Sequence, residues 1–231
     1  MSSVRFRYSA WDLSPFILNP DHMQKTINDI ISNDWFRYMD YLSGYDNVIH
    51  YSWRKKTISR AERKEIRAML EEIDEVTGIT FKKTRKRDDD IRFISVPEIT
   101  DDTLLEFSDL GHQNSTFLVD DAVVGRASAG TKRMKIFFRD NDDHVSLLEK
   151  YILRHELGHT LGLGHPRGQG NDPDFTVADT IMSYNVYQGP AFFYYGFTSL
   201  DKQALQNLWG LNPEAYTVNS VMKPQDIVEI L

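Results

Sequence analysis

The stretch that decides the fold is His155-Glu-Leu-Gly-His159-Thr-Leu-Gly162-Leu-Gly-His165. Residues four apart on an α-helix lie about 40° apart around the axis and about 6 Å apart along it, so His155 and His159 can direct two imidazoles at one metal ion. Glu156, rotated by about 100° from His155, can reach a water molecule on that ion without being a ligand itself. Gly162 can adopt a positive φ, which lets the helix end and the chain turn back, so that His165 can approach as a third ligand.

Three imidazoles leave one position of a tetrahedral Zn²⁺ open to water, which is the arrangement of a catalytic zinc site and not of a structural one. Water bound there has its pKa lowered towards about 7 and becomes a nucleophile at neutral pH. The alternative is that the histidines simply pack in a helical core. At average residue frequencies, the motif with its glycine and third histidine occurs by chance in about one chain of this length in a hundred thousand. The sequence therefore predicts one catalytic zinc ion.

The composition is consistent with a site built from histidine. The chain has 231 residues and no cysteine, which excludes disulfides, thiolate metal ligands and a cysteine nucleophile. It carries 27 Lys and Arg against 34 Asp and Glu, a net charge of −7, which argues against a broad basic face for nucleic acid. No apolar run approaches the roughly 18 residues of a membrane span. The first residues lack the apolar region of a secretory signal peptide, so an extracellular, a particle-associated and a cytoplasmic location all stay open.

Helical and extended patterns alternate along the chain and favour an α+β fold with a mixed sheet. Asn19 and Pro20 can begin a helix whose apolar spacing continues to Leu42, before Gly44 ends it. Five strands are expected, at 48–53, 79–81, 91–94, 122–127 and 134–138, and residues 97–118 are expected to be irregular. Three further helices are expected: one after the Ser59–Glu62 capping box, one from Asp142 or Asp143 through the zinc motif, and one from Thr198–Asp201.

The pattern His-Glu-x-x-His-x-x-Gly-x-x-His, followed by Asp179-Thr-Ile-Met182-Ser-Tyr184, resembles the metzincin zinc endopeptidases, whose second signature is a methionine-containing turn, the Met-turn. The Met-Ser-Tyr form and Pro166 after the third histidine are similar to the serralysin branch. The resemblance covers roughly residues 46 to 212. It implies a twisted mixed five-stranded sheet packed on the active-site helix, followed by a smaller, mostly irregular C-terminal subdomain with a helix.

The resemblance also implies roles for individual residues. His155, His159 and His165 would bind zinc, Glu156 would be the general base, and Met182 would lie under the zinc ligands. Tyr184 would lie beside the metal, as a fifth ligand or as a hydrogen-bond donor to the tetrahedral intermediate. The strand containing Gly125, Arg126 and Ala127 would be the edge of the sheet along which an extended peptide substrate pairs.

We therefore expect residues 1–45 to form an N-terminal helical extension and residues 46–231 a zinc-peptidase domain, divided into an upper subdomain (46–165) and a lower one (166–231). The extension can block the cleft, with Asp12 or Asp21 as a zinc ligand, dock onto a larger assembly, or only pack on the domain. The expected function is a zinc endopeptidase that acts on proteins or peptides. The alternative is a structural or binding component of a virion or secretion particle built on the same scaffold.

Other polar and aromatic stretches have simpler interpretations. Asp140-Asn-Asp-Asp143 offers oxygen atoms for Ca²⁺ but lacks the glycine and distal glutamate of a known loop, and helix capping explains it more simply. The basic run Lys82-Lys-Thr-Arg-Lys-Arg87 precedes three aspartates, so a solvated turn is favoured over contact with nucleic acid or lipid. The aromatic residues between 187 and 197 can border the pocket for the residue after the scissile bond, or pack in the core.

Overall fold

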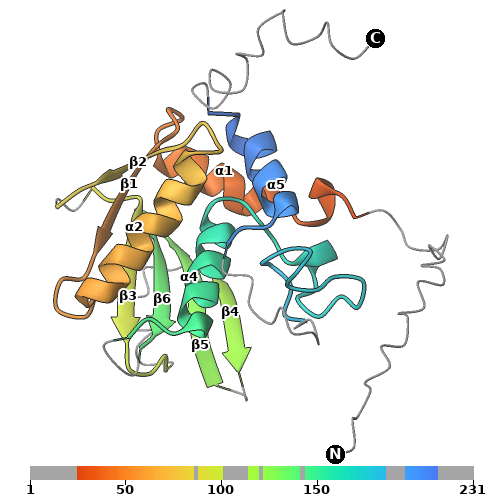
Figure 1. The fold of residues 1–231 in the computed structure, drawn as a ribbon. Helices are drawn as coiled ribbons and strands as arrows, with labels where there is room; N and C mark the ends of the chain where they lie inside the picture. The colour runs from red at the N-terminus through yellow and green to blue at the C-terminus, as the bar shows by residue number, and fades with distance from the viewer. Residues whose placement is uncertain are drawn as a thin grey trace, which may run out of the picture.

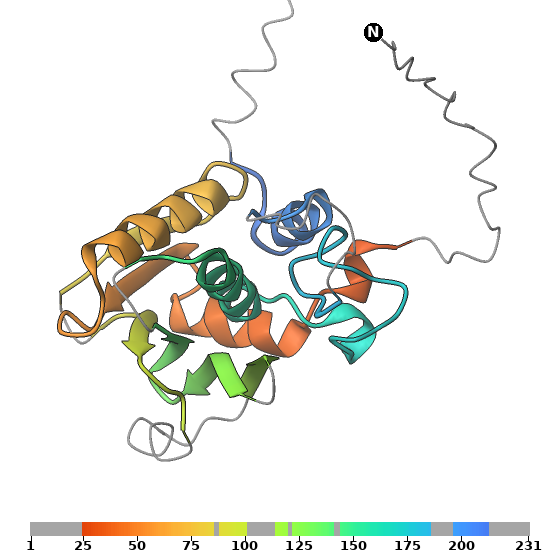
Figure 2. The same ribbon diagram turned by 60° about the horizontal axis from the view of Figure 1, so that its bottom comes forward.

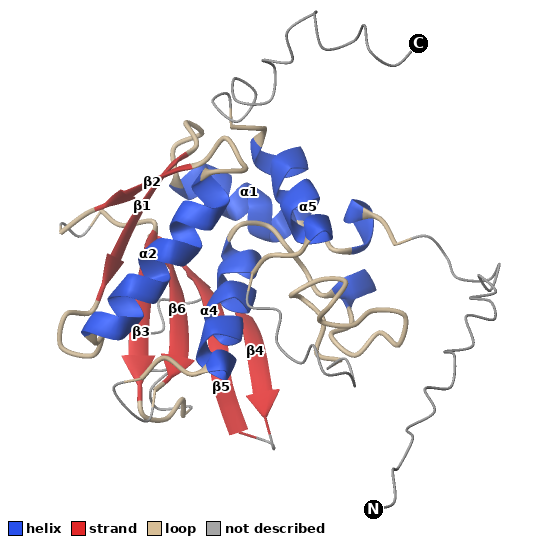
Figure 3. Cartoon of the chain, viewed as in Figure 1, coloured by secondary structure: helices blue, strands red, loops and turns tan. Residues whose placement is uncertain are grey.

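The computed structural model describes residues 25–85, 88–100, 114–119, 122–140, 144–185 and 196–212. In order across the sheet, the strands are β2 (Thr80–Lys83), β1 (Val48–Trp53), β3 (Ile91–Val96), β6 (Arg133–Arg139), β5 (Ala122–Gly130) and β4 (Asn114–Val119). The helices are α1 (Asn33–Leu42), α2 (Arg60–Asp74), α4 (Leu147–Thr160) and α5 (Ser199–Trp209), with 3-10 turns at Ile27–Asp29 and Pro166–Gly168. Helices α2 and α4 lie over one face of the sheet (Figures 1 and 3). The expected α+β class with a mixed sheet is confirmed.

The two ends of the sheet differ in strand direction. Strands β2, β1, β3 and β6 are parallel, whereas β5 and β4 continue the sheet antiparallel. All five expected strands are present, and the sixth, β4, begins near the end of the stretch expected to be irregular. On β5, Gly125 pairs with Phe117 of β4 on one side and with Phe138 of β6 on the other. The prediction that Gly125, Arg126 and Ala127 form the edge of the sheet was therefore wrong, and β4 is the edge strand at this end.

The helix starts follow from capping boxes, in which a Ser or Thr hydroxyl and a carboxylate three residues later bond each other's backbone N–H groups. Helix α2 begins after Ser59, as predicted. Helix α4 begins after Ser146, whose hydroxyl accepts a hydrogen bond from the Glu149 backbone N–H at 3.2 Å. The prediction that Asp142 or Asp143 caps this helix was therefore wrong; both residues lie outside the described residues. Helix α5 begins after Thr198, again as predicted.

The helix expected from Pro20 onwards is broken in its described part. A 3-10 turn at Ile27–Asp29 is followed by α1 only from Asn33. Between them the chain pairs with the turn after α4: the Gly164 N–H donates to the Ile30 carbonyl at 2.7 Å, and the Ser32 N–H donates to the Gly162 carbonyl at 2.8 Å. These backbone bonds hold Ile31 in a β-bridge and Ser32 in an extended conformation, so tertiary pairing overrides the helical spacing of the side chains.

Part of the segment 25–45, which was expected to belong to an N-terminal extension, packs into the main core. Trp35 and Met39 of α1 are buried in the main hydrophobic cluster. The Phe36 and Trp209 rings meet edge to face with centroids 5.1 Å apart, which joins α1 to α5. Figure 2 shows that α1 lies next to α4 and crosses it. Residues 1–24, with Asp12 and Asp21, lie outside the described residues.

The central strands β3 and β6 are buried almost along their whole length, as expected for parallel strands covered on both faces. The main core lies between the sheet and the helices, while Ile94, Val96, Ile99 and Phe137 form a second cluster. None of the described helices combines the length and the apolar character that crossing a bilayer demands.

Candidate metal centre

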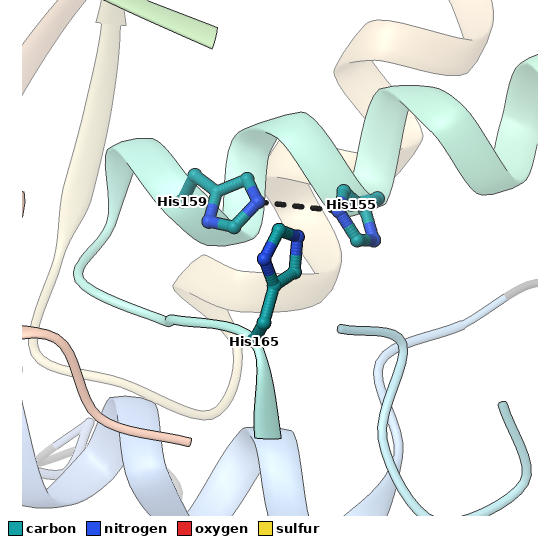
Figure 4. Close-up of side chains that lie close together, drawn as sticks. All are labelled: His155, His159 and His165. Carbon is teal, nitrogen blue, oxygen red and sulfur yellow. Dashed lines mark hydrogen bonds between the residues drawn. The ribbon is translucent and has the colours of Figure 1, made fainter. Parts of the chain in front are cut away.

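The three histidines of the motif come together at the end of α4. His155 and His159 project from successive turns of the helix, and His165 reaches them from the chain that follows (Figure 4). Gly162 has φ +104°, the positive value that the predicted turn requires. A Cβ atom on Gly162 would also lie 2.8 Å from Cβ of Phe36, so the turn needs glycine for its conformation and for its contact with α1.

Backbone carbonyls hold two of the rings in one orientation. The Nδ1 atom of His155 lies 2.8 Å from the Ile181 carbonyl oxygen, and Nδ1 of His159 lies 2.9 Å from the Leu163 carbonyl oxygen. A carbonyl oxygen can only accept, so in both rings Nδ1 carries the proton and donates it. In each neutral ring Nε2 then carries no proton, so its lone pair is available to bind a metal ion.

Burial keeps these rings neutral. It lowers the pKa of His155 to about 3, helped by the neighbouring His165, and lowers the pKa of His159 well below its usual value. Burial also lowers the pKa of His165 to about 4. At neutral pH all three imidazoles are therefore unprotonated at one nitrogen and able to bind a metal ion.

The arrangement fits a shared cation. The Nε2 atoms of His155 and His159 lie 3.2 Å apart, a pair drawn as a dashed line in Figure 4. Neither Nε2 atom carries a proton, so the two rings cannot form a hydrogen bond and their Nε2 lone pairs face each other. Two nitrogens each about 2.0–2.1 Å from one tetrahedral zinc ion are separated by about 3.3 Å. Nε2 of His165 is buried and has no hydrogen-bond partner among the described residues, and the ligand atoms of all three histidines lie within 4.8 Å of one another.

Glu156 is fully buried and packs against strand β5. A Cβ atom on Gly125 would lie 2.9 Å from Oε1 of Glu156 and 2.4 Å from Cγ2 of Ile152. Only a glycine leaves room for α4 to lie this close to the strand. Gly125 thus allows the Glu156 side chain to pack directly against β5. This role differs from the edge position predicted for Gly125.

The Met-turn lies directly beneath the helix. Met182 is fully buried, and its Sδ atom would be 2.7 Å from a Cβ atom on Gly158, between the two helical histidines. Tyr184 then brings its ring against the histidines, with centroids 5.3 Å from His155 and 4.7 Å from His165. Burial and the negative charge of Glu156 raise the pKa of Tyr184 further above its usual value, so its hydroxyl stays protonated and can donate a hydrogen bond.

Asp201, at the third position of α5, holds the Met-turn from the other side. Its buried carboxylate accepts hydrogen bonds from the Thr180 hydroxyl at 2.5 Å and from the backbone N–H groups of Ile181 at 3.0 Å and Thr198 at 2.8 Å. The Ile181 carbonyl in turn orients His155. The sequence shows Asp201 as a helix cap but carries no signal for its bonds to the Met-turn.

Tyr151 and Trp35 also support the site and were not predicted to do so. The Tyr151 hydroxyl donates to the Ser183 carbonyl at 2.5 Å, one residue before Tyr184. The Trp35 ring of α1 stacks on His159 with a centroid separation of 5.8 Å. Tyr151 lies four residues before His155 and therefore on the same side of α4, which is the one sequence signal that could have found it.

Other candidate residues are not brought to this centre. Among the residues with described positions, the histidine triad is the one group of His, Asp or Glu side chains arranged to hold a metal ion, so no group for Ca²⁺ is found there. Residues 141–143 of the acidic run and residues 186–195 of the aromatic stretch lie outside the described residues. Phe197, at the end of that stretch, is buried in the main core.

Comparisons with known proteins add little to the geometry. No family model and no curated protein matches the sequence. The solved structures that match include a chain of the "GM1 bound form of the ECX AB5 holotoxin", which is 14% identical, with 78% of this chain and 84% of that chain covered and a TM-score of 0.42. A likeness at this level carries no weight in assigning a function, which is therefore based on the metal centre.

Proposed function

We propose that this chain is a zinc-dependent endopeptidase of the metzincin type, nearest the serralysin branch, with Glu156 as general base. The observation that carries the proposal is the pair of unprotonated Nε2 atoms, 3.2 Å apart, on the helix that also carries the fully buried Glu156. Support for the metzincin type comes from the glycine turn to His165 and from the packing of Met182 beneath the helix.

In this proposal His155, His159 and His165 hold the zinc ion. Bound zinc supplies Lewis acidity, which acidifies water and polarises a peptide carbonyl. Glu156 accepts a proton from the attacking water and delivers it to the leaving amine. The protonated Tyr184 hydroxyl donates a hydrogen bond to the oxyanion, and a well-placed donor of this kind contributes about 3 kcal/mol to stabilising the transition state.

The substrate is an extended peptide that adds to the sheet. Because β5 is paired on both sides, the backbone edge open to such a peptide at this end is that of β4. A structural or binding component of a larger assembly is the competing function. Such a component has no chemical need for a carboxylate at Glu156 or a phenol at Tyr184, and both residues lie beside the histidines.

The test is a zinc analysis of the purified chain together with cleavage of a peptide library by wild type, Glu156→Gln and Glu98→Gln. Glu98 is an exposed glutamate after β3 and controls for the same chemical change elsewhere. We expect stoichiometric zinc in all three proteins, a fall in cleavage of at least about a hundredfold in Glu156→Gln, and an unchanged rate in Glu98→Gln. Equal rates in the two variants, or wild type without zinc, would rule the proposal out.

A further inference from the structure

A group of cationic side chains gathers around Trp53, where the end of β1 meets α2 and β2. Nζ of Lys83 lies 3.6 Å from the centre of the Trp53 ring, and the guanidinium carbons of Arg63 and Arg67 lie 5.8 and 5.9 Å from it. We define the cation cluster as Lys55, Arg63, Arg67, Lys83 and Arg85. These residues come from the loop after β1, from α2, and from β2 and the turn that follows it, elements that lie at the left of Figure 1.

The cluster has no carboxylate partner among the described residues. Arg63 donates to the Lys55 and Ile58 carbonyls, at 3.1 and 2.6 Å, but to no acid. The acidic residues of α2 that form ion pairs, Glu65 and Glu72, pair with cations of α4 and α5. Burial, and then repulsion from the four other cations, lowers the pKa of Lys83. This concentration of positive charge stands on a chain whose net charge is −7.

A pocket extends this surface along α2. Its volume is about 590 Å³, and it is lined by Ser59, Arg60, Ala61, Lys64 and Arg67. Arg67 therefore belongs to both the pocket and the cluster, and Arg60 and Lys64 add two exposed cations. Cations gathered in a hollow and along its rim favour a ligand with several negative charges.

The outer edge of β2 borders the cation cluster. The backbone N–H groups of Thr80 and Thr84 donate towards β1, to the Asn47 and Tyr51 carbonyls. Because alternate residues of a strand point their N–H groups to opposite sides, those of Phe81 and Lys83 point away from β1. Strand β2 ends the sheet in the described structure, so this edge can accept another strand.

We propose that this surface binds an extended, acidic polypeptide segment, whose backbone pairs with the edge of β2 while its carboxylates contact the cation cluster. The free strand edge favours a polypeptide over nucleic acid or lipid, since neither of those can continue a ladder of backbone hydrogen bonds. Charge complementarity with the cation cluster makes this surface prefer acidic segments. The segment belongs to a separate partner protein, and its binding does not require that the partner be cleaved.

Binding can be measured on the full chain carrying Glu156→Ala, by fluorescence anisotropy at low ionic strength. That background separates this inference from the proposed function, because no cleavage is needed. The probes are a labelled peptide of alternating Glu and Thr and one of alternating N-methyl-Glu and Pro, which has the same charge but no backbone N–H group to donate to a strand. We expect the Glu-Thr peptide to bind more tightly and both to weaken with added salt.

The test variant is Arg67→Glu with Lys83→Glu, and the matched control is Arg37→Glu with Lys132→Glu, two exposed cations on α1 and on the β5–β6 turn. We expect about tenfold weaker binding of the Glu-Thr peptide by the test variant and unchanged binding by the control. If the test variant unfolds, Arg67→Gln with Lys83→Gln removes the charge without reversing it. The proposal would be overturned if the test and control variants lost affinity equally, or if the parent protein bound neither peptide. Equal affinity for the two peptides, or tighter binding of a duplex oligonucleotide or of anionic vesicles, would also overturn it.

Discussion

Replacing Asp201 tests how far the metal centre depends on α5. The Asp201→Ala change removes the acceptor of three hydrogen bonds, from the Thr180 hydroxyl and from the backbone N–H groups of Ile181 and Thr198. Loss of the helix cap at Thr198 costs about 1 kcal/mol. The other two donors are buried, and each costs a further 1–3 kcal/mol, roughly, when it is left without an acceptor.

The expected loss in the free energy of unfolding is therefore about 3–7 kcal/mol, which lowers Tm by roughly 10 °C or more in a domain of this size. The Ile181 carbonyl orients His155, so we also expect zinc affinity to fall about 10–100-fold. Thermal unfolding followed by circular dichroism and zinc titration against a competing chelator measure the two effects.

The matched control is Glu62→Ala, which removes the equivalent third-position carboxylate from the capping box of α2. It should cost about 1 kcal/mol and leave zinc affinity unchanged, because the Glu62 carboxylate accepts the Ser59 backbone N–H and has no described hydrogen bond to a residue that orients the histidines. If Asp201→Ala does not fold, Asp201→Asn retains one acceptor oxygen and is expected to lie between wild type and Ala. Equal stability losses in the Ala variants, or wild-type zinc affinity in a folded Asp201 variant, would refute this reasoning.

Three further predictions concern the surroundings of the histidines. Gly125→Ala should destabilise the fold by about 1–3 kcal/mol through overpacking and, under the proposed function, lower kcat by displacing the Glu156 carboxylate; unfolding curves and peptide cleavage measure the two effects. Tyr151→Phe should lower kcat more than it changes KM or zinc affinity, because loss of the hydrogen bond to the Ser183 carbonyl shifts Tyr184. In the metal-free protein, His155 and His165 have pKa values of about 3 and 4, below their unfolded value, so stability is fully present above pH 6.5 and is lost as pH falls towards these values.

Each of these predictions has a result that contradicts it. Full activity in Gly125→Ala would mean that the helix does not need its close approach to β5. A raised KM with unchanged kcat in Tyr151→Phe would place the effect on substrate binding alone. Metal-free stability that stays constant between pH 6.5 and 4 in urea titrations would mean that the histidines are exposed to solvent.

The parts of the fold that the sequence predicted are those set by local chemistry. The capping boxes at Ser59 and Thr198 and the positive φ at Gly162 involve residues a few positions apart, so a single sequence contains all the information. The metal centre was predictable for the same reason, since two of its ligands and Glu156 share one helix. Residue spacing along a helix translates directly into positions in space.

The parts that could not be predicted depend on pairing between distant segments. The break in the helical pattern at Ile30–Ser32 exists because this stretch bonds the backbone around Gly162, and this pairing outweighs the helical spacing of the apolar side chains. The sixth strand moved the sheet edge from Gly125 to β4, and the register of β4 depends on a bulge at Phe117. No periodicity within either segment encodes its partner.

The contacts around His159 and His155 have a consequence for synthesis of the chain. Trp35, which stacks on His159, precedes the three histidines in the sequence, whereas Asp201, which bonds the Met-turn, follows them. A nascent chain on the ribosome therefore contains all three histidines before Asp201, which holds the Met-turn, has been translated. The full orientation of His155 is therefore expected only after α5 has been translated and has folded against the Met-turn.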